Sequence, residues 1–310
     1  MIKLLDYIKL FCFKVGLKDK PTKIKMHKGD IPLIGGLLFL SILLIINFFV
    51  SINIYSNIYL LILLSLIGIW DDIKNLNPNF KFLITFVSLL IIISIDKSLQ
   101  IQIINFKHFD DIYLVNEKIL KIFVPTICLL LLLNAFNMAD GINGLAGTIF
   151  LSWSTYLLFK FSNLLELILP FTIGSIFFLY LNLNKKCFLG DGGNYFLSML
   201  VGSITIKLNN TELGLLVAEE IFLLFLIPGI DMLRLFILRI KKNKNPFYGD
   251  RYHLHHYLIK KYSLKKSLLI YLSLINTPLY IYIFSEINLI VLILSSLLVY
   301  FFLIRLLVFK

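Results

Sequence analysis

The sequence predicts an all-α polytopic membrane protein with about ten transmembrane helices, or eleven if its N-terminal segment also crosses. Apolar side chains make up 59% of its 310 residues, charged ones only 15%, and the mean hydropathy is +0.88. Soluble domains are usually about 45 to 50% apolar. Runs approaching the ~20 apolar residues that a bilayer crossing needs recur along the chain. They lie near residues 31–52, 57–70, 80–95, 120–137, 145–160, 164–181, 195–207, 214–238, 267–284 and 287–308.

The first fifteen residues predict a helix at the membrane surface and not a first span. Charged side chains at Lys3, Asp6, Lys9 and Lys14 interrupt this stretch before any long apolar run develops. The pattern also lacks the apolar core of a secretory signal. We therefore expect an interfacial amphipathic helix.

The remaining composition narrows the class of protein. The chain has neither repeats nor a low-complexity linker, so residues 1–310 are expected to form a single domain. Residues 96–119 predict a polar loop with balanced charge and a small β-hairpin. An odd number of scattered cysteines argues against a disulfide framework, a zinc ribbon or redox chemistry. They are Cys12, Cys128 and Cys187.

Basic residues predict the orientation in the membrane. The first thirty residues contain eight lysines, and residues 234–266 contain ten lysines or arginines. Cytoplasmic segments carry this excess, which accounts for the net charge of +12 without nucleic-acid binding. Ten crossings then place the segments around Asp71, Asp140, Asp191 and His253 together at the cytoplasmic face.

Adjacent carboxylates at Asp71 and Asp72 end one apolar stretch, and Lys81 follows. Neighbouring acids repel each other unless a cation or proton lies between them. Mg²⁺ favours such carboxylates together with phosphate oxygens and water. The alternative is a pair of solvated acids at the end of a span.

A second polar cluster follows the apolar run at 122–133. Asn134, Asn137 and Asp140 recur every three residues, which places them on one side of a helix. Gly141 and Gly144 let the backbone open or let a ligand approach closely. Hydrogen bonding between helices is the alternative, although three polar groups with two glycines exceed what that role needs.

A third cluster is Asp191 among glycines, beside Lys185 and Lys186. Free N–H groups of a glycine-rich backbone can cradle phosphate while Asp191 holds a metal ion. A tight turn with an Asx motif explains the same residues.

A fourth cluster lies in the longest basic segment, where Arg251 offers a fork to phosphate oxygens. His253 and His256 share a helical face, and His255 lies between them. Zinc bound with Asp250 and a solvated basic loop are the alternatives.

Three smaller features complete the set. Lys28 precedes a proline and a glycine pair that break the start of the first apolar run, where it could face phosphate. Asp231 and Arg234 have the spacing of an ion pair on a helix. Two acids within an apolar stretch, Glu219 and Glu220, indicate pairing or a polar cavity.

Taken in order, these segments resemble the polyprenyl-phosphate N-acetylhexosamine-1-phosphate transferases of glycosyltransferase family 4. The resemblance runs from about Val15 to about Leu258, and its specificity comes from the ordered set of motifs. The motifs are His27 with Pro32 and Gly35–Gly36, Gly68 with Asp71–Asp72, Asn134 with Asn137 and Asp140–Gly141, Gly190–Asp191, and Asp250–Arg251 with His253 and His255–His256.

The resemblance implies transfer of N-acetylglucosamine 1-phosphate, or a related hexosamine 1-phosphate, from the UDP-sugar to undecaprenyl phosphate, with release of UMP. This step would initiate a lipid-linked cell-envelope glycan at the cytoplasmic side of a bacterial inner membrane. The alternative within the family is the phospho-MurNAc-pentapeptide transferase of peptidoglycan synthesis. A secondary transporter is the alternative from another class, although the chain lacks a repeat and its acids cluster at one face.

The resemblance also implies roles for individual residues. Asp71 would accept a proton from the acceptor, and a covalent intermediate on Asp191 is the alternative. Asn143 stands where relatives commonly have Asp, so it is left out of the catalytic set. Membrane lipids would surround the protein, and a homodimer is one option for its oligomeric state. The expected catalytic residues are Asp71, Asp72, Asp140 and Asp191; Mg²⁺, or Mn²⁺ in its place, would bind Asp191 and Asp72; phosphate or substrate would contact Lys28, Lys81, Asn134, Asn137, Arg251, His253, His255 and His256.

Overall fold

A computed structural model describes residues 2–20, 29–49, 58–211, 214–246, 250–285 and 287–308 of the chain. The described part is mostly helical, and each of the ten predicted apolar stretches contains a helix. These helices are α2 (Gly35–Phe49), α3 (Ile58–Lys74), α4 (Pro78–Ile95), α5 (Leu120–Ala139), α6 (Leu145–Lys160), α7 (Leu165–Leu183), α8 (Gly190–Asn209), α9 (Ala218–Lys241), α11 (Leu264–Ser285) and α12 (Leu289–Val308).

The described helices include six that are long and apolar enough to cross a membrane: α4, α5, α7 with the preceding 3₁₀ turn η2 (Ser162–Leu164), α9, α11 and α12. The predicted class, an all-α membrane protein, is therefore confirmed, whereas the predicted number of about ten spans is not. The helices α2, α3 and α6 have 15, 17 and 16 residues. At 1.5 Å per residue they are shorter than the ~30 Å hydrocarbon layer. The helix α8 has a polar first turn.

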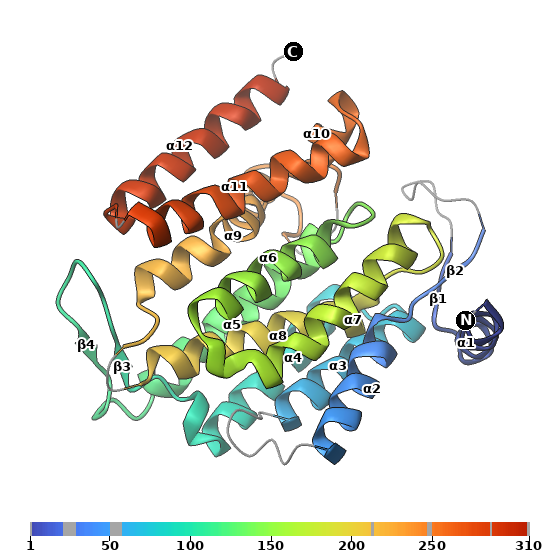
Figure 1. The fold of residues 1–310 in the computed structure, drawn as a ribbon, viewed down its shortest axis with the longest axis horizontal. Helices are drawn as coiled ribbons and strands as arrows, with labels where there is room; N and C mark the ends of the chain where they lie inside the picture. The colour runs from blue at the N-terminus through green and yellow to red at the C-terminus, as the bar shows by residue number, and fades with distance from the viewer. Residues whose placement is uncertain are drawn as a thin grey trace.

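The long helices run side by side, with α8 near the centre (Figure 1). All residues of α8 except Gly190, Asp191 and Lys207 are buried. In contrast, only 17% of the apolar window of α4 and 22% of that of α12 are buried within the protein. Large side chains such as Leu83 and Leu298 are exposed there, so these outer helices are suited to face lipid.

Glycines allow α2 and α3 to pack closely against the first turns of α8. A Cβ atom added to Gly68 of α3 would lie 2.5 Å from the backbone carbonyl of Asp191. A Cβ on Gly36 of α2 would lie 3.2 Å from the carbonyl carbon of Gly192. The glycine pair that was expected to break the first helix therefore brings its backbone against α8.

The α1 helix (Ile2–Val15) has the character expected of a helix at the membrane surface. Figure 1 shows it nearly end-on, whereas the long helices run across the view. Cys12 is buried against the protein, while Tyr7, Leu10 and Phe11 are 70%, 65% and 53% exposed. An exposed apolar stripe with flanking lysines suits the lipid interface. Strand β1 (Lys18–Asp19) then pairs antiparallel with β2 (Ile31–Pro32).

The loop between α4 and α5 contains the predicted hairpin. After the 3₁₀ turn η1 (Lys97–Leu99), strand β3 (Ile103–Ile104) pairs antiparallel with β4 (Ile112–Tyr113). This hairpin and the short helix α10 (Leu254–Lys261) lie at opposite ends of the molecule (Figure 1).

Both buried acids at the start of α9 have partners at the hairpin end. Glu219 accepts hydrogen bonds from the backbone N–H groups of Lys107 and His108, at 3.1 and 3.0 Å. Glu220 pairs with Lys160 of α6 at 2.5 Å and accepts a hydrogen bond from Tyr156. These contacts confirm the expectation of pairing. They also satisfy the need of a buried carboxylate for donors.

Replacing Gly68 with Ala should lower the thermal stability of the detergent-solubilised protein, by about 1 to 3 kcal/mol, because its methyl group overlaps the backbone of α8. Gly229→Ala is the control, since no atom lies within 4 Å of the added Cβ. That change should be neutral or stabilise by up to about 1 kcal/mol. Equal melting temperatures for both variants would contradict the close packing.

Candidate active site

Four of the predicted clusters meet at the end of the molecule opposite the hairpin. Asp71 and Asp72 end α3, Lys81 begins α4, and Asp140 follows α5. Asp191 lies in the first turn of α8. The histidine segment contributes the start of α10. The expectation that these sequence-distant residues gather is confirmed for the described residues, and their position at the cytoplasmic face stays a prediction.

Asp72 holds the start of α8. Its two carboxylate oxygens accept hydrogen bonds from the backbone N–H groups of Asp191, at 2.8 Å, and Gly192, at 3.1 Å. The first N–H groups of a helix have no partner within the helix and carry partial positive charge, so a carboxylate suits them. The expectation that these glycine-loop N–H groups are free to cradle phosphate is therefore wrong at positions 191 and 192.

Lys81 lies between two of the predicted catalytic carboxylates. Its ammonium group contacts Asp71 Oδ2 at 2.7 Å and also contacts Asp191 Oδ2. Asp71 Oδ1 accepts a hydrogen bond from the N–H of Leu76 at 2.7 Å, which orients the carboxylate. Asp71 and Asp191 thus share the ammonium group of Lys81. The carboxylates of Asp191 and its neighbour Asp72 are the ligand type that Mg²⁺ binds together with phosphate oxygens.

Asn194 joins the second cluster to α8. Its side-chain Nδ2 donates to Asn137 Oδ1 at 3.1 Å and to Asp140 Oδ2 at 2.9 Å. Burial raises the pKa of Asp140 to about 6, although the hydrogen bond from Asn194 opposes this shift. Sequence reasoning missed Asn194, and its place three residues after Asp191, on the same side of a helix, was the available signal.

Three predicted residues stand apart from these contacts. Asn134 donates its side-chain N–H to Leu130 O of its own helix, at 2.7 Å. Arg251 is exposed. Lys28 lies outside the described residues. Their roles in binding phosphate or substrate stay predictions.

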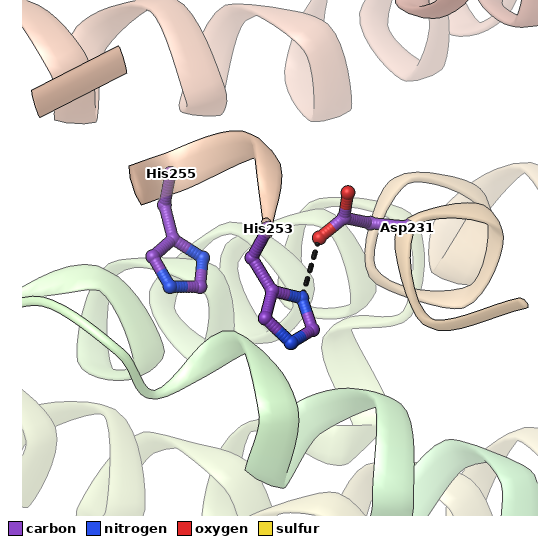
Figure 2. A group of neighbouring side chains, drawn as sticks. All are labelled: Asp231, His253 and His255. Carbon is purple, nitrogen blue, oxygen red and sulfur yellow. Dashed lines mark hydrogen bonds and ion pairs between the residues drawn. The ribbon is translucent and has the colours of Figure 1, made fainter. Parts of the chain in front are cut away.

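The histidine segment lies against α9 and the loop after α5. His253 Nδ1 is 2.8 Å from Asp231 Oδ2, and the rings of His253 and His255 are stacked with centroids 5.3 Å apart (Figure 2). His255 is fully buried, and neither ring nitrogen has a hydrogen-bond partner among the described residues. A Cβ atom on Gly141 would overlap His255 Nε2. The missing side chain of Gly141 therefore leaves space for the His255 ring, whereas the sequence predicted that it lets a ligand approach.

His255 and His256 are held in neutral form by their surroundings. Burial, with His256 and His253 nearby, holds the pKa of His255 well below its usual range. Burial also lowers the pKa of His256 to about 4. Both rings are then uncharged near pH 7, so each can donate one N–H hydrogen bond.

The zinc alternative has a different set of candidate ligands from the one expected. Asp250 pairs with Arg239 at 2.7 Å and lies outside the group. Asp231, His253 and His255 offer ligand atoms within 4.8 Å of one another. However, Asp231 also accepts a hydrogen bond from the Arg234 guanidinium, at 2.8 Å, which confirms the predicted ion pair. The two oxygens of Asp231 also accept hydrogen bonds from a tyrosine hydroxyl and a backbone N–H, so protein donors already occupy this carboxylate.

Comparison with known proteins identifies the family. Residues 54–209, which include the acid pair, the asparagine cluster and the start of α8, match the family described as "Glycosyl transferase family 4". The chain belongs to glycosyl transferase family 4. This family member is also similar over most of its length to proteins named undecaprenyl-phosphate alpha-N-acetylglucosaminyl 1-phosphate transferase.

Three such relatives illustrate the similarity. The Thermotoga maritima protein is 29% identical over 273 residues, which cover 87% of this chain and 82% of the relative. The Escherichia coli K12 protein is 27% identical over 266 residues, and the Salmonella typhi protein is 26% identical over the same number. Both alignments cover 80% of this chain and 70% of the relative.

Gly141→Ala should abolish sugar-phosphate transfer while the protein stays folded, because the methyl group displaces the buried His255 ring. The measurement is transfer activity together with thermal unfolding in detergent. Gly229→Ala serves as the matched control, since its added Cβ meets no atom within 4 Å. Wild-type activity in the Gly141 variant would show that the position of His255 is irrelevant to transfer.

Transfer activity should fall as the pH drops through about 6, the pKa to which burial raises Asp140, because protonation removes a carboxylate acceptor. Asn194→Ala removes a hydrogen bond to the charged form of Asp140. The fall of activity on the acid side of the pH–rate profile, its acid limb, should therefore move to higher pH by about 1 unit. The comparison is between pH–rate profiles of the two proteins with identical substrates, which cancels the titration of the acceptor phosphate.

Ser198→Ala is the control for this profile. Ser198 is also buried in α8, but its hydroxyl bonds to Asn194 O and Tyr195 O of its own helix. Its acid limb should coincide with that of the wild type. If the activity of Asn194→Ala falls at the same pH as that of the wild type, Asp140 is not the group whose protonation lowers the activity.

Proposed function

We propose that this family 4 protein transfers N-acetylglucosamine 1-phosphate, or a related hexosamine 1-phosphate, from its UDP-sugar to undecaprenyl phosphate, releasing UMP. The observation that carries the proposal is that Asp71 and Asp191 both pair with the ammonium group of Lys81, at the polar end of a membrane helix bundle. The printed name shared by the relatives supports this acceptor and this sugar.

The reaction exchanges one phosphoanhydride for another, so its main demand is to bring two anionic phosphates together. Catalysis of such transfer consists mostly of positioning and electrostatic stabilisation. Asp191 would hold Mg²⁺, or Mn²⁺, with Asp72 assisting, and the bound metal would neutralise charge on the donor diphosphate. Lys81, Arg251 and the histidines would bind the remaining phosphate oxygens.

The acids have distinct roles in this proposal. Asp72 fixes the backbone of Asp191 and Gly192, so it sets where the Asp191 carboxylate lies. Asp71 accepts the proton of the acceptor phosphate, a modest role because that phosphate, with a second pKa of about 6, is already mostly ionised near neutral pH. Asp140 and Asn137, held by Asn194, present oxygen acceptors to the nucleotide sugar.

The membrane setting fits a water-soluble donor and a lipid acceptor. The lysine-rich N-terminal segment and the basic stretch at 234–266 support a cytoplasmic position for the site. We propose ten crossings of a bacterial inner membrane, with α1 at its surface. The polyprenyl tail then lies among apolar helices while its phosphate reaches Asp71 at the interface. A homodimer stays a prediction.

The alternatives have less support. The names of the three relatives favour the N-acetylglucosamine donor over the donor of the peptidoglycan enzyme. A secondary transporter is disfavoured by family membership and by acids gathered at one end of the bundle.

Membranes that contain this protein should transfer label from radiolabelled UDP-N-acetylglucosamine into butanol-extractable lipid, with an equal amount of UMP released. EDTA should stop the reaction, and added Mg²⁺ should restore it. Asp191→Asn should lower the rate about 100-fold or more, because the charge that binds the metal is lost. Lipid label and UMP are measured in parallel.

Asp110→Asn is the matched control, since it removes an exposed acid from the loop at the opposite end. Its rate should equal that of the wild type. Absence of lipid product with UDP-N-acetylglucosamine and with other UDP-hexosamines, in folded protein, would refute the proposed reaction. Full activity in EDTA would refute the metal.

A further inference from the structure

Asp231 lies at the centre of a buried hydrogen-bond network next to the histidines. It projects from α9, and only 3% of its surface is exposed. Its Oδ2 faces His253 Nδ1 at 2.8 Å. Its Oδ1 accepts from Arg234, at 2.8 Å, and from the Tyr300 hydroxyl of α12, at 2.6 Å. The N–H of Leu254 donates to both oxygens, at 3.1 and 3.3 Å.

This network fixes both the rotation and the tautomer of His253. A carboxylate accepts a hydrogen bond, so the proton shared with Asp231 belongs to Nδ1 of the imidazole. Nε2 is then the ring atom that can interact with another group. Figure 2 shows Nε2 of His253 on the side of the ring away from Asp231, toward the green ribbon. The neighbouring His255 reaches Gly141 of the loop between α5 and α6, directly after Asp140.

The partners of Asp231 also show why it is more than one half of an ion pair. Arg234 alone would satisfy its charge, yet Tyr300 of α12 and a backbone N–H also donate to the same carboxylate. Arg234 Nε in turn donates to the Tyr300 oxygen at 2.8 Å. The carboxylate is therefore fixed from three sides, and its fourth contact is with His253.

We propose that Asp231 is a positioning residue for transfer, which acts through His253 on the diphosphate of the sugar nucleotide. The inference rests on the function proposed above. Asp231 keeps the proton on Nδ1 and compensates the charge of an imidazolium. A bound diphosphate favours that imidazolium from the other side, and Nε2–H donates to a phosphate oxygen. Tyr300 and Arg234 hold Asp231 in place, so α12 contributes to the active face.

We call this action of Asp231 through His253 on the diphosphate the relay. A double-mutant cycle tests it. Asp231→Asn and His253→Ala should each raise the KM for UDP-N-acetylglucosamine about tenfold, with the KM for undecaprenyl phosphate unchanged. The double variant should match His253→Ala within about twofold, because Asp231 acts only through that ring. Asp231→Glu should retain more activity than Asp231→Asn. Losses that multiply, or equal changes in both KM values, would overturn the proposal in favour of a structural role.

Tyr300→Phe provides a second variant should Asp231→Asn not fold. It leaves the Asp231–His253 contact and removes one donor to Asp231. The expected result is a severalfold rise in the donor KM alone, and an unchanged donor KM would overturn the link to α12. Metal analysis of the purified wild type addresses the remaining alternative. Tightly bound zinc that is lost in His253→Ala would overturn the relay in favour of a metal site.

Calorimetric binding of UDP-N-acetylglucosamine separates this inference from the proposed function. If the wild type binds the sugar nucleotide without transferring it, the proposed reaction fails, while a tenfold weaker affinity in both single variants still supports the relay. If the wild type transfers sugar but its affinity is unchanged in the variants, the relay fails and the function stands. Absence of any binding would overturn both.

Discussion

The arrangement of the active face depends on the contact between Asp72 and the first turn of α8. Two backbone N–H groups of α8 point at one carboxylate from the end of α3, and the helices approach closely because Gly68 has no side chain. This contact fixes Asp191, which meets Lys81 and through it Asp71. It also fixes Asn194, one turn further along α8, which holds Asp140. A change at the start of α8 would therefore displace both halves of the site together.

The fold could be predicted well from hydropathy because bilayer crossing imposes a strong compositional constraint. Each predicted apolar stretch contains a helix, and the hairpin near residues 103–113 was expected from the polar loop. The number of crossings could not be settled in this way. Helices such as α6, with 16 residues, and α8, with its acidic first turn, are buried by their neighbours and do not need the full length of a lipid-facing span.

The site was predicted less evenly. Acids and histidines were placed at one face because orientation follows from basic residues and chain direction. What could not be predicted is which backbone groups they satisfy. The glycines around Asp191 suggested a phosphate cradle, but α3 supplies an acid to the same N–H groups. Asn194 and Tyr300 were missed because their partners lie 54 and 69 residues away in the sequence.

Tyr300 has a consequence for how the protein is made. Its hydroxyl reaches Asp231 from α12, the last helix that the structure describes, while Asp71, Asp72 and Asp191 lie on α3 and α8, which are synthesised earlier. If Asp231 positions His253 as proposed, the active face is completed only after α12 has left the ribosome and entered the bilayer. A nascent chain that had inserted only its earlier helices would already display the acid pair, but its histidine would lack a fixed orientation. Activity would then begin only once α12 has inserted.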